Sequence, residues 1–169
     1  MKFLSYLFMA MLLSGAISCQ AQTPKLGHIN SADLLAAMPE VKKADSSLQG
    51  YQKTLEDQNQ TMLTEYQQKV QDFQKSGQSW TDAVKEVKQS EIQDLQGRIQ
   101  DFQQTAQDKL QTKKQEIYAP ILKKAEDTIK QVAKDNNYSY VFDTSAGAVV
   151  YFPDTDDLMT LVKKKLGLK

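Results

Sequence analysis

The sequence predicts an α+β fold in which one long antiparallel helical hairpin, a coiled-coil arm, projects from a small body with three short strands. Three observations predict this fold. Apolar residues between about residues 48 and 110 recur at helical spacings of three, four and seven. Seven of them on each side form pairs that lie at nearly equal distances from residues 78–79. Runs rich in β-branched and aromatic residues lie only outside this span.

The N-terminus is typical of a secretory signal peptide covering residues 1–21. Lys2 precedes an apolar run over residues 3–17, and small residues follow. Cleavage before Gln22 is the favoured interpretation, and a lipoprotein signal that retains Cys19 is the alternative. No later run reaches the ~18 apolar residues that a membrane span needs. We therefore expect a soluble periplasmic protein, with membrane contact only if Cys19 is lipidated.

The composition argues against a catalytic or metal-binding protein. The 169 residues carry 21 basic and 21 acidic side chains, with one Cys and one His. That supply cannot build a zinc site with several Cys and His ligands. Asp143 and Ser145 resemble part of a catalytic triad, but His28 is the single histidine and is expected to be structural. We therefore predict no enzyme activity, no cofactor, no metal and no nucleic-acid partner.

The body is expected to comprise residues 25–44 and 118–169. Its first strand covers residues 25–30, and a cap at Asn30 or Ser31 starts a short helix over residues 32–38. Pro39 either ends that helix or starts the next one, because a proline disfavours the helical conformation of the residue before it.

The arm is expected to comprise residues 45–117, with its tip near residues 76–80. Gly77 is expected to take the positive φ that ends the first helix. Ser79 is expected to cap the second helix, which Trp80 would open. At 1.5 Å per residue, each helix of the arm should reach about 45 Å.

An apolar seam is predicted between the two helices of the arm. Going outward from the tip, Met62 would face Leu95, whereas Ile99 would face Gln58 or Asn59 and leave a gap. Many of the other arm positions are glutamines or charged residues, so the seam is narrow. The predicted seam residues are Leu55, Met62, Tyr66, Val70, Phe73, Val84, Val87, Leu95 and Phe102.

The second helix of the arm continues into the body with a wider apolar stripe. Pro120 lies in that stripe, and its missing hydrogen bond should kink the helix where arm becomes body. Strands over residues 138–142 and 148–152 would then form a hairpin. A last helix would start at Asp154 or Thr155, with lysines in its final turn.

The body alone is small for an independent core. Its pieces total roughly 70 residues, a size at which a single core is marginal. Three short strands also leave the edges of the sheet open. Both points predict a homo-oligomer, without fixing the number of subunits.

The order of these elements resembles the Skp/OmpH family of periplasmic chaperones over nearly the whole mature chain. The resemblance is carried by KLGHINSADLLAAM (residues 25–38), VAKDNNYSYVFDT (132–144) and VVYFPDTDDLMTLVKKKLGL (149–168). It implies a trimer whose strands form a small central barrel. It also implies that the arms surround a cavity holding unfolded outer-membrane proteins, without ATP. The best-known family member has basic arms, whereas these arms mix acidic and basic residues, which argues against lipopolysaccharide binding and against electrostatic capture.

Two classes of function follow from these observations. The first is an ATP-independent periplasmic holdase that binds unfolded outer-membrane proteins between its arms. The alternative is a structural coiled-coil spacer or a lipid-anchored envelope tether. Trp80 is the candidate client contact because little of the helix can cover it at the tip, whereas seam aromatics such as Tyr66 and Phe102 are expected to pack inside the arm.

Overall fold

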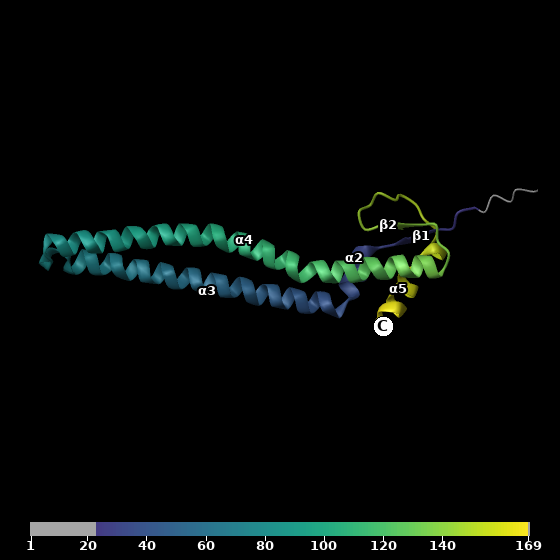
Figure 1. Cartoon of the computed structure of the whole chain (residues 1–169), viewed down its shortest axis with the longest axis horizontal. Coiled ribbons are helices and arrows are strands. Elements are labelled where there is room, and N and C mark those ends of the chain that lie inside the picture. Colours follow the sequence, from purple (N-terminus) through teal and green to yellow (C-terminus); the bar gives the residue numbers. More distant parts are fainter. Residues whose placement is uncertain (1–22, 169) are drawn as a thin grey trace, which may run out of the picture.

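A pair of long antiparallel helices runs out from a small body at one end of the molecule (Figure 1). The computed structural model describes residues 23–168. The predicted signal peptide and Cys19 lie outside the described residues. The C-terminal end lies at the body, beside the base of the arm (Figure 1).

The arm consists of α3 (Pro39–Ser76), a short 3₁₀ turn η1 (Gly77–Ser79) and α4 (Asp82–Asp135). Pro39 occupies the first turn of α3, and Met38 before it is extended with a ψ of 124°. Pro39 therefore starts the second helix, where its missing N–H has no intrahelical partner to lose. α4 runs through Pro120 without a break and changes direction as it approaches the body (Figure 1).

The body contains two strands and three short helical segments. They are β1 (Leu26–Ile29), α2 (Ser31–Ala37), β2 (Tyr140–Asp143), η2 (Asp154–Asp156) and α5 (Met159–Leu166). β1 and β2 pair in parallel, with Leu26 opposite Tyr140 and Ile29 opposite Asp143. On the other side of β1, His28 forms an isolated bridge with Asp157.

The ends of the short helices follow local sequence signals. The Asn30 side chain accepts hydrogen bonds from the backbone N–H groups of Ala32 and Asp33, both at 3.1 Å, which confirms the predicted cap. At the other end of the chain, Gly167 ends α5 with a φ of 71°, and three lysines occupy the last turn. The predicted start of this helix at Asp154 or Thr155 is wrong, because those residues form η2 and α5 begins only at Met159.

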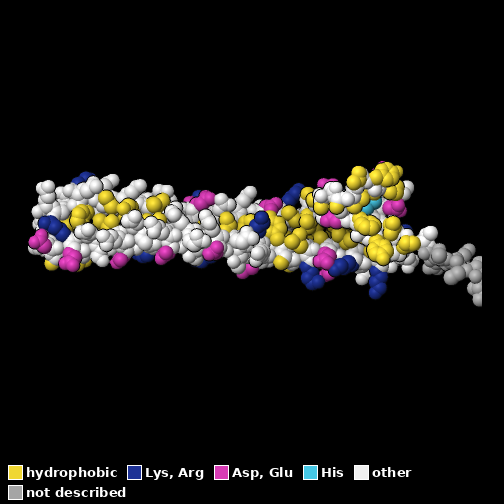
Figure 2. Space-filling model, turned by 90° about the horizontal axis from the view of Figure 1, so that it is seen from above, with side chains coloured by type: hydrophobic (Ala, Val, Ile, Leu, Met, Phe, Trp, Pro, Cys, Tyr) yellow, Lys and Arg dark blue, Asp and Glu magenta, His cyan; other side chains and the backbone are white. Residues whose placement is uncertain are grey.

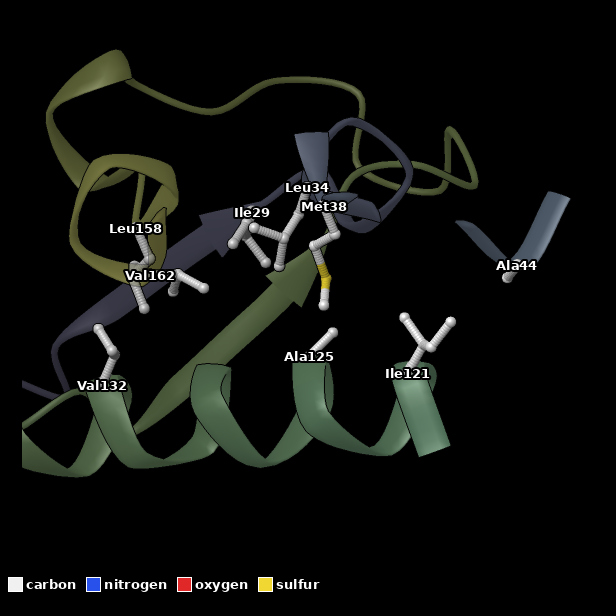
Figure 3. Packing of buried hydrophobic residues seen from close by; sticks show 9 residues of the cluster. All are labelled: Ile29, Leu34, Met38, Ala44, Ile121, Ala125, Val132, Leu158 and Val162. Atoms are coloured by element: carbon white, nitrogen blue, oxygen red, sulfur yellow. The ribbon is translucent and has the colours of Figure 1, made fainter. Parts of the chain in front are cut away.

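The hydrophobic core lies in the body, where the C-terminal part of α4 packs against β1, α2 and α5 (Figure 3). Leu34, Met38, Leu158 and Val162 are fully buried in it. The core is completed at the base of the arm, where Ala44 of α3 and Ile121 of α4 are buried. The whole cluster is Ile29, Leu34, Met38, Ala44, Ile121, Ala125, Val132, Leu158 and Val162.

The predicted hairpin between residues 138–142 and 148–152 is wrong. β2 pairs with β1 instead, and the connection between these two strands is the whole arm. Residues 148–152 form no strand, and no strand of the described chain pairs with them, although Phe152 packs on His28 of β1. Because a strand needs a neighbour for its backbone hydrogen bonds, β propensity alone does not make this segment a strand.

The structure also corrects the tip. Gly77 has a φ of −59°, so it continues the helical turn into η1 and takes no left-handed conformation. The cap of α4 is Thr81, whose hydroxyl accepts a hydrogen bond from the N–H of Val84. Ser79 instead donates to the carbonyl of Ser76, and Trp80 is extended and lies outside the helix.

Candidate functional site

The middle of the arm has a polar surface over a partly buried seam. Leu95 and Ile99 are buried, at 2% and 7% exposure. Leu55, Met62, Tyr66, Val70, Phe73 and Phe102 are half-buried. Val84 and Val87, nearest the tip, are exposed. The seam is therefore most closed in the middle of α4 and opens toward the tip.

Polar contacts between α3 and α4 lie on either side of the buried seam residues. They show which positions of the two helices lie opposite each other. The Lys69 ammonium donates to Glu91 at 3.0 Å, and the Gln103 amide donates to Asn59 at 3.4 Å. Hydrogen bonds from Lys69 and Lys88 hold the pKa of the Glu91 carboxyl below its usual value, and the bond to Glu91 raises the pKa of Lys69.

Ile99 is the arm residue that the sequence interpretation misplaced. Counting one helical turn inward from each polar contact places Ile99 level with Met62, and Leu95 level with Tyr66. Ile99 therefore fills the seam, where a gap was expected. Its position one turn beyond Leu95 was a signal in the sequence that could have placed it there.

The tip brings together an aromatic pair and two exposed valines. The rings of Phe73 and Trp80 lie 5.8 Å apart and meet edge to face, so Trp80 is half-buried. Val84 is 40% exposed and Val87 is 57% exposed. Apolar side chains gather near the tip and over the body, with a mostly polar stretch between them (Figure 2).

Polar contacts join the two helices at the base of the arm. Lys124 donates to Glu40 at 2.6 Å, which lowers the pKa of the Glu40 carboxyl. The Tyr118 hydroxyl donates to Asp45, and this bond raises the pKa of Tyr118. Pro120 lies between these two contacts along α4.

One face of the two-stranded sheet is largely bare. Gly27 and Ile29 are buried on the face toward the core, whereas Leu26, Tyr140 and Phe142 on the other face are 46%, 61% and 45% exposed. Two open grooves flank β2. One, of about 660 Å³, is lined by α4, α2 and β2, and the other, of about 400 Å³, lies between the bare face and residues 148–153.

His28 is buried and holds the segment that follows β2. Its ring packs on Phe152 with the centroids 4.1 Å apart, and its Nε2 lies 3.1 Å from the carbonyl oxygen of Pro153. Because a carbonyl only accepts, Nε2 carries the proton. The contacts of His28 are therefore structural. Although His28 contacts Phe152 and Pro153, the neighbouring Val150 and Tyr151 are 97% and 85% exposed.

Asp143 and Ser145 form hydrogen bonds with each other and with Ser31. The Asp143 carboxylate accepts from the Ser31 hydroxyl at 2.6 Å and from the backbone N–H groups of Ser31 and Ser145. Burial alone would raise the pKa of Asp143, but these hydrogen bonds lower it to about 2. The cluster ties the end of β2 to the start of α2.

The described part of the chain contains neither a cluster of metal ligands nor a membrane-spanning helix. Within residues 23–168, no three His, Cys, Asp or Glu side chains gather closely enough to hold a metal ion. The helices of the same residues include none with the length and apolar character needed to cross a bilayer. Asp154, Asp156 and Asp157 instead lie in and after η2, and Asp157 accepts from the N–H of Met159 at 2.7 Å.

Comparison with known proteins gives one family and one fold. The model of a family described as "Outer membrane protein (OmpH-like)" matches residues 25–166. A solved structure from Caulobacter crescentus CB15, described as an outer membrane chaperone (OmpH-like), aligns with a TM-score of 0.75. The two chains are 15% identical, and the alignment covers 85% of this chain and 84% of that one. No curated protein matches this chain.

Proposed function

The chain belongs to the OmpH-like family, and we propose that it is a periplasmic holdase that binds unfolded outer-membrane proteins without ATP or catalysis. The observation that carries the proposal is the extent of the family match, which includes both the arm and the body. Family membership supports a chaperone role in general, and the arm surface supports the more specific mechanism below.

An unfolded β-barrel protein exposes alternating apolar residues and unpaired backbone groups. A holdase has to cover both without a fixed partner. Glutamine side chains on the arms offer donors and acceptors that can exchange partners as the client moves. The narrow apolar seam offers only scattered contacts, so each contact is weak and the sum is multivalent. Trp80 is the proposed aromatic contact at the tip.

We infer that the body mediates assembly into a homo-oligomer, with the trimer implied by the family. Support comes from the bare face of the sheet, formed by Leu26, Tyr140 and Phe142, and from the exposed Val150 and Tyr151 beside it. Such clustered apolar surface is unusual on a monomer. Neighbouring copies would cover it and complete the small core.

An aggregation assay with an unfolded outer-membrane β-barrel tests the holdase function. We expect the full-length mature chain to suppress client aggregation, and suppression to persist at about 0.5 M salt because the charges of the chain balance. Steep loss of suppression between low and high salt would restore electrostatic capture as the mechanism. No suppression at any salt, with the oligomer intact by sedimentation, would reject the holdase function and favour a structural spacer.

A further inference from the structure

The seam pattern of the sequence breaks down near the tip. Val84 and Val87 continue the helical spacing that leads to Leu95, yet they are 40% and 57% exposed whereas Leu95 is 2% exposed. The two valines are three residues apart on α4, so they share one face of the helix. These two apolar side chains are only partly covered by the rest of the arm.

The reason lies in the position of Trp80. Because α4 begins only at Asp82, Trp80 lies outside the helix and packs edge to face on Phe73. Equal distances from the turn would place Phe73 opposite Val84, whereas in the structure the indole of Trp80 packs on Phe73. Trp80 is therefore half-buried, whereas Val84 in the first turn of α4 remains 40% exposed.

Several charged side chains beside this surface are paired within the arm. Lys85 contacts Asp82 at 3.4 Å, and Lys69 and Lys88 both contact Glu91 at 3.0 Å. An extended charged client segment would compete with these pairs, whereas an uncharged apolar segment would leave them intact. The complementary partner is therefore apolar and uncharged.

We propose that Trp80, Val84 and Val87 form an apolar tip stripe that binds uncharged extended segments with alternating apolar residues; this deepens and rests on the proposed holdase function. Same-face residues of an extended chain lie about 7 Å apart. Neighbouring same-face positions on a helix lie about 5–6 Å apart. Two consecutive apolar side chains of such a segment can therefore contact Val84 and Val87 together.

The chain carries its own reporter for this stripe, because Trp80 is its single tryptophan. The probe is a blocked octapeptide that alternates Val and Ser and carries no charge. Its control is the same peptide with every Val replaced by Thr, which keeps the shape of each side chain and exchanges one of its two methyl groups for a hydroxyl. We expect the Val peptide to shift Trp80 emission to the blue in a saturable titration, and the Thr peptide to have little effect.

Isosteric variants test the two valines without disturbing the helix. We expect Val84→Thr with Val87→Thr to weaken peptide binding about three- to tenfold. Val84→Ile with Val87→Ile should strengthen binding. The matched control is Ala83→Ser, an exposed neighbour in the same turn that leaves both valines in place, and it should bind as the parent chain does.

Three results would overturn the stripe. They are unchanged binding by the Thr variant, an equal response to the Thr peptide, or a change of oligomeric state in the Thr variant, which would make the stripe a contact between copies. Failure of the holdase function is distinguishable. Peptide binding that the Thr variant weakens, without suppression of β-barrel aggregation, supports the stripe and rejects the holdase. Suppression that the Thr variant retains in full, with unchanged peptide binding, rejects the stripe alone.

Discussion

Replacing Gly27 with alanine should destabilise the body through a steric clash. Gly27 lies on the core face of β1, where a Cβ atom would lie 2.5 Å from Cδ1 of Leu158 and 2.8 and 2.9 Å from two ring carbons of Tyr138. These separations are far below van der Waals contact, so at least one neighbour has to move. Leu158 is fully buried and has little room to do so.

The size of the effect follows from the number of atoms that clash. Inserting one methyl group into a close-packed site typically lowers the free energy of unfolding by about 1–3 kcal/mol. With three contacts below 3.0 Å, we expect Gly27→Ala to fall in the upper half of that range. Chemical denaturation followed by far-UV circular dichroism, at one fixed protein concentration, measures the loss.

Two other glycines supply matched controls. A Cβ at Gly50 in α3 or at Gly97 in α4 would meet nothing within 4 Å. Alanine at either position should therefore raise the free energy of unfolding of the arm by about 0.5–1 kcal/mol, because alanine favours a helix over glycine. The same substitution is thus expected to change sign between sheet and arm.

A double variant decides whether the clash is the cause. Leu158→Ala alone should cost about 2–5 kcal/mol because it leaves a cavity. Combined with Gly27→Ala, the total loss should be smaller than the two separate losses together, by about 0.5 kcal/mol or more, since the new methyl enters space that Leu158 vacated. Strictly additive losses, or an unaffected Gly27→Ala variant, would refute this account of the packing.

Three further predictions concern the body and the arm. The pKa of Asp143 is lowered in the folded chain to about 2, so the stabilisation by its carboxylate is present above pH 4 and is lost as pH falls toward 2. Asp143→Asn should remove this pH dependence and lower the free energy of unfolding at pH 7 by about 1 kcal/mol, allowing for solvent exposure. Acid denaturation curves of the two chains measure both effects. Cysteines at Met62 and Ile99 should cross-link within one chain faster than cysteines at Met62 and Leu95, as reducing and non-reducing gels would show; the reverse order would restore the pairing first expected from the sequence. Val150→Asp should leave the helix content of the chain intact, because Val150 is 97% exposed, yet should dissociate the oligomer in sedimentation; an intact oligomer would place Val150 outside the interface.

The helical part of this fold could be predicted because its signals are local. Apolar spacing marks the two long helices, and Asn30 and Gly167 mark helix ends through contacts with residues at most a turn away. Pro39 was ambiguous from the sequence alone, since the rule that a proline disfavours helix before it allows both readings. The extended conformation of Met38 resolves that ambiguity.

The strands could be predicted only as strand-forming segments. Whether residues 148–152 form a strand depends on a neighbour, and in this chain β2 takes β1 as its partner across the whole arm. Propensity carries no information about a partner so distant in sequence. The same limit applies to His28, whose contacts with Phe152 and Pro153 join opposite ends of the chain.

The sequence indicated the spacing of the seam residues along each helix, but it oversimplified which residues of the two helices face each other. Pairing residues at equal distances from the turn assumes that one stripe faces the partner along the full helix. A straight helix has 3.6 residues per turn, so a stripe spaced by sevens drifts by about 20° per heptad. From Val84 to Ile99, slightly more than two heptads, that drift acts in the same direction as the position of Trp80: it turns the valines out and Ile99 in.

The parallel pairing of β1 with β2 has a consequence for how the chain folds. Leu26 meets Tyr140 only after the intervening chain has been brought back on itself, so the body has a high contact order and should form slowly. Zipping of the arm from its tip down to the Tyr118–Asp45 contact shortens the loop that remains to be closed to residues 30–45 and 118–139. By the logarithmic cost of loop closure, this saves about 1 kcal/mol of chain entropy. Substitutions in the seam should therefore slow the folding of a sheet that they do not touch.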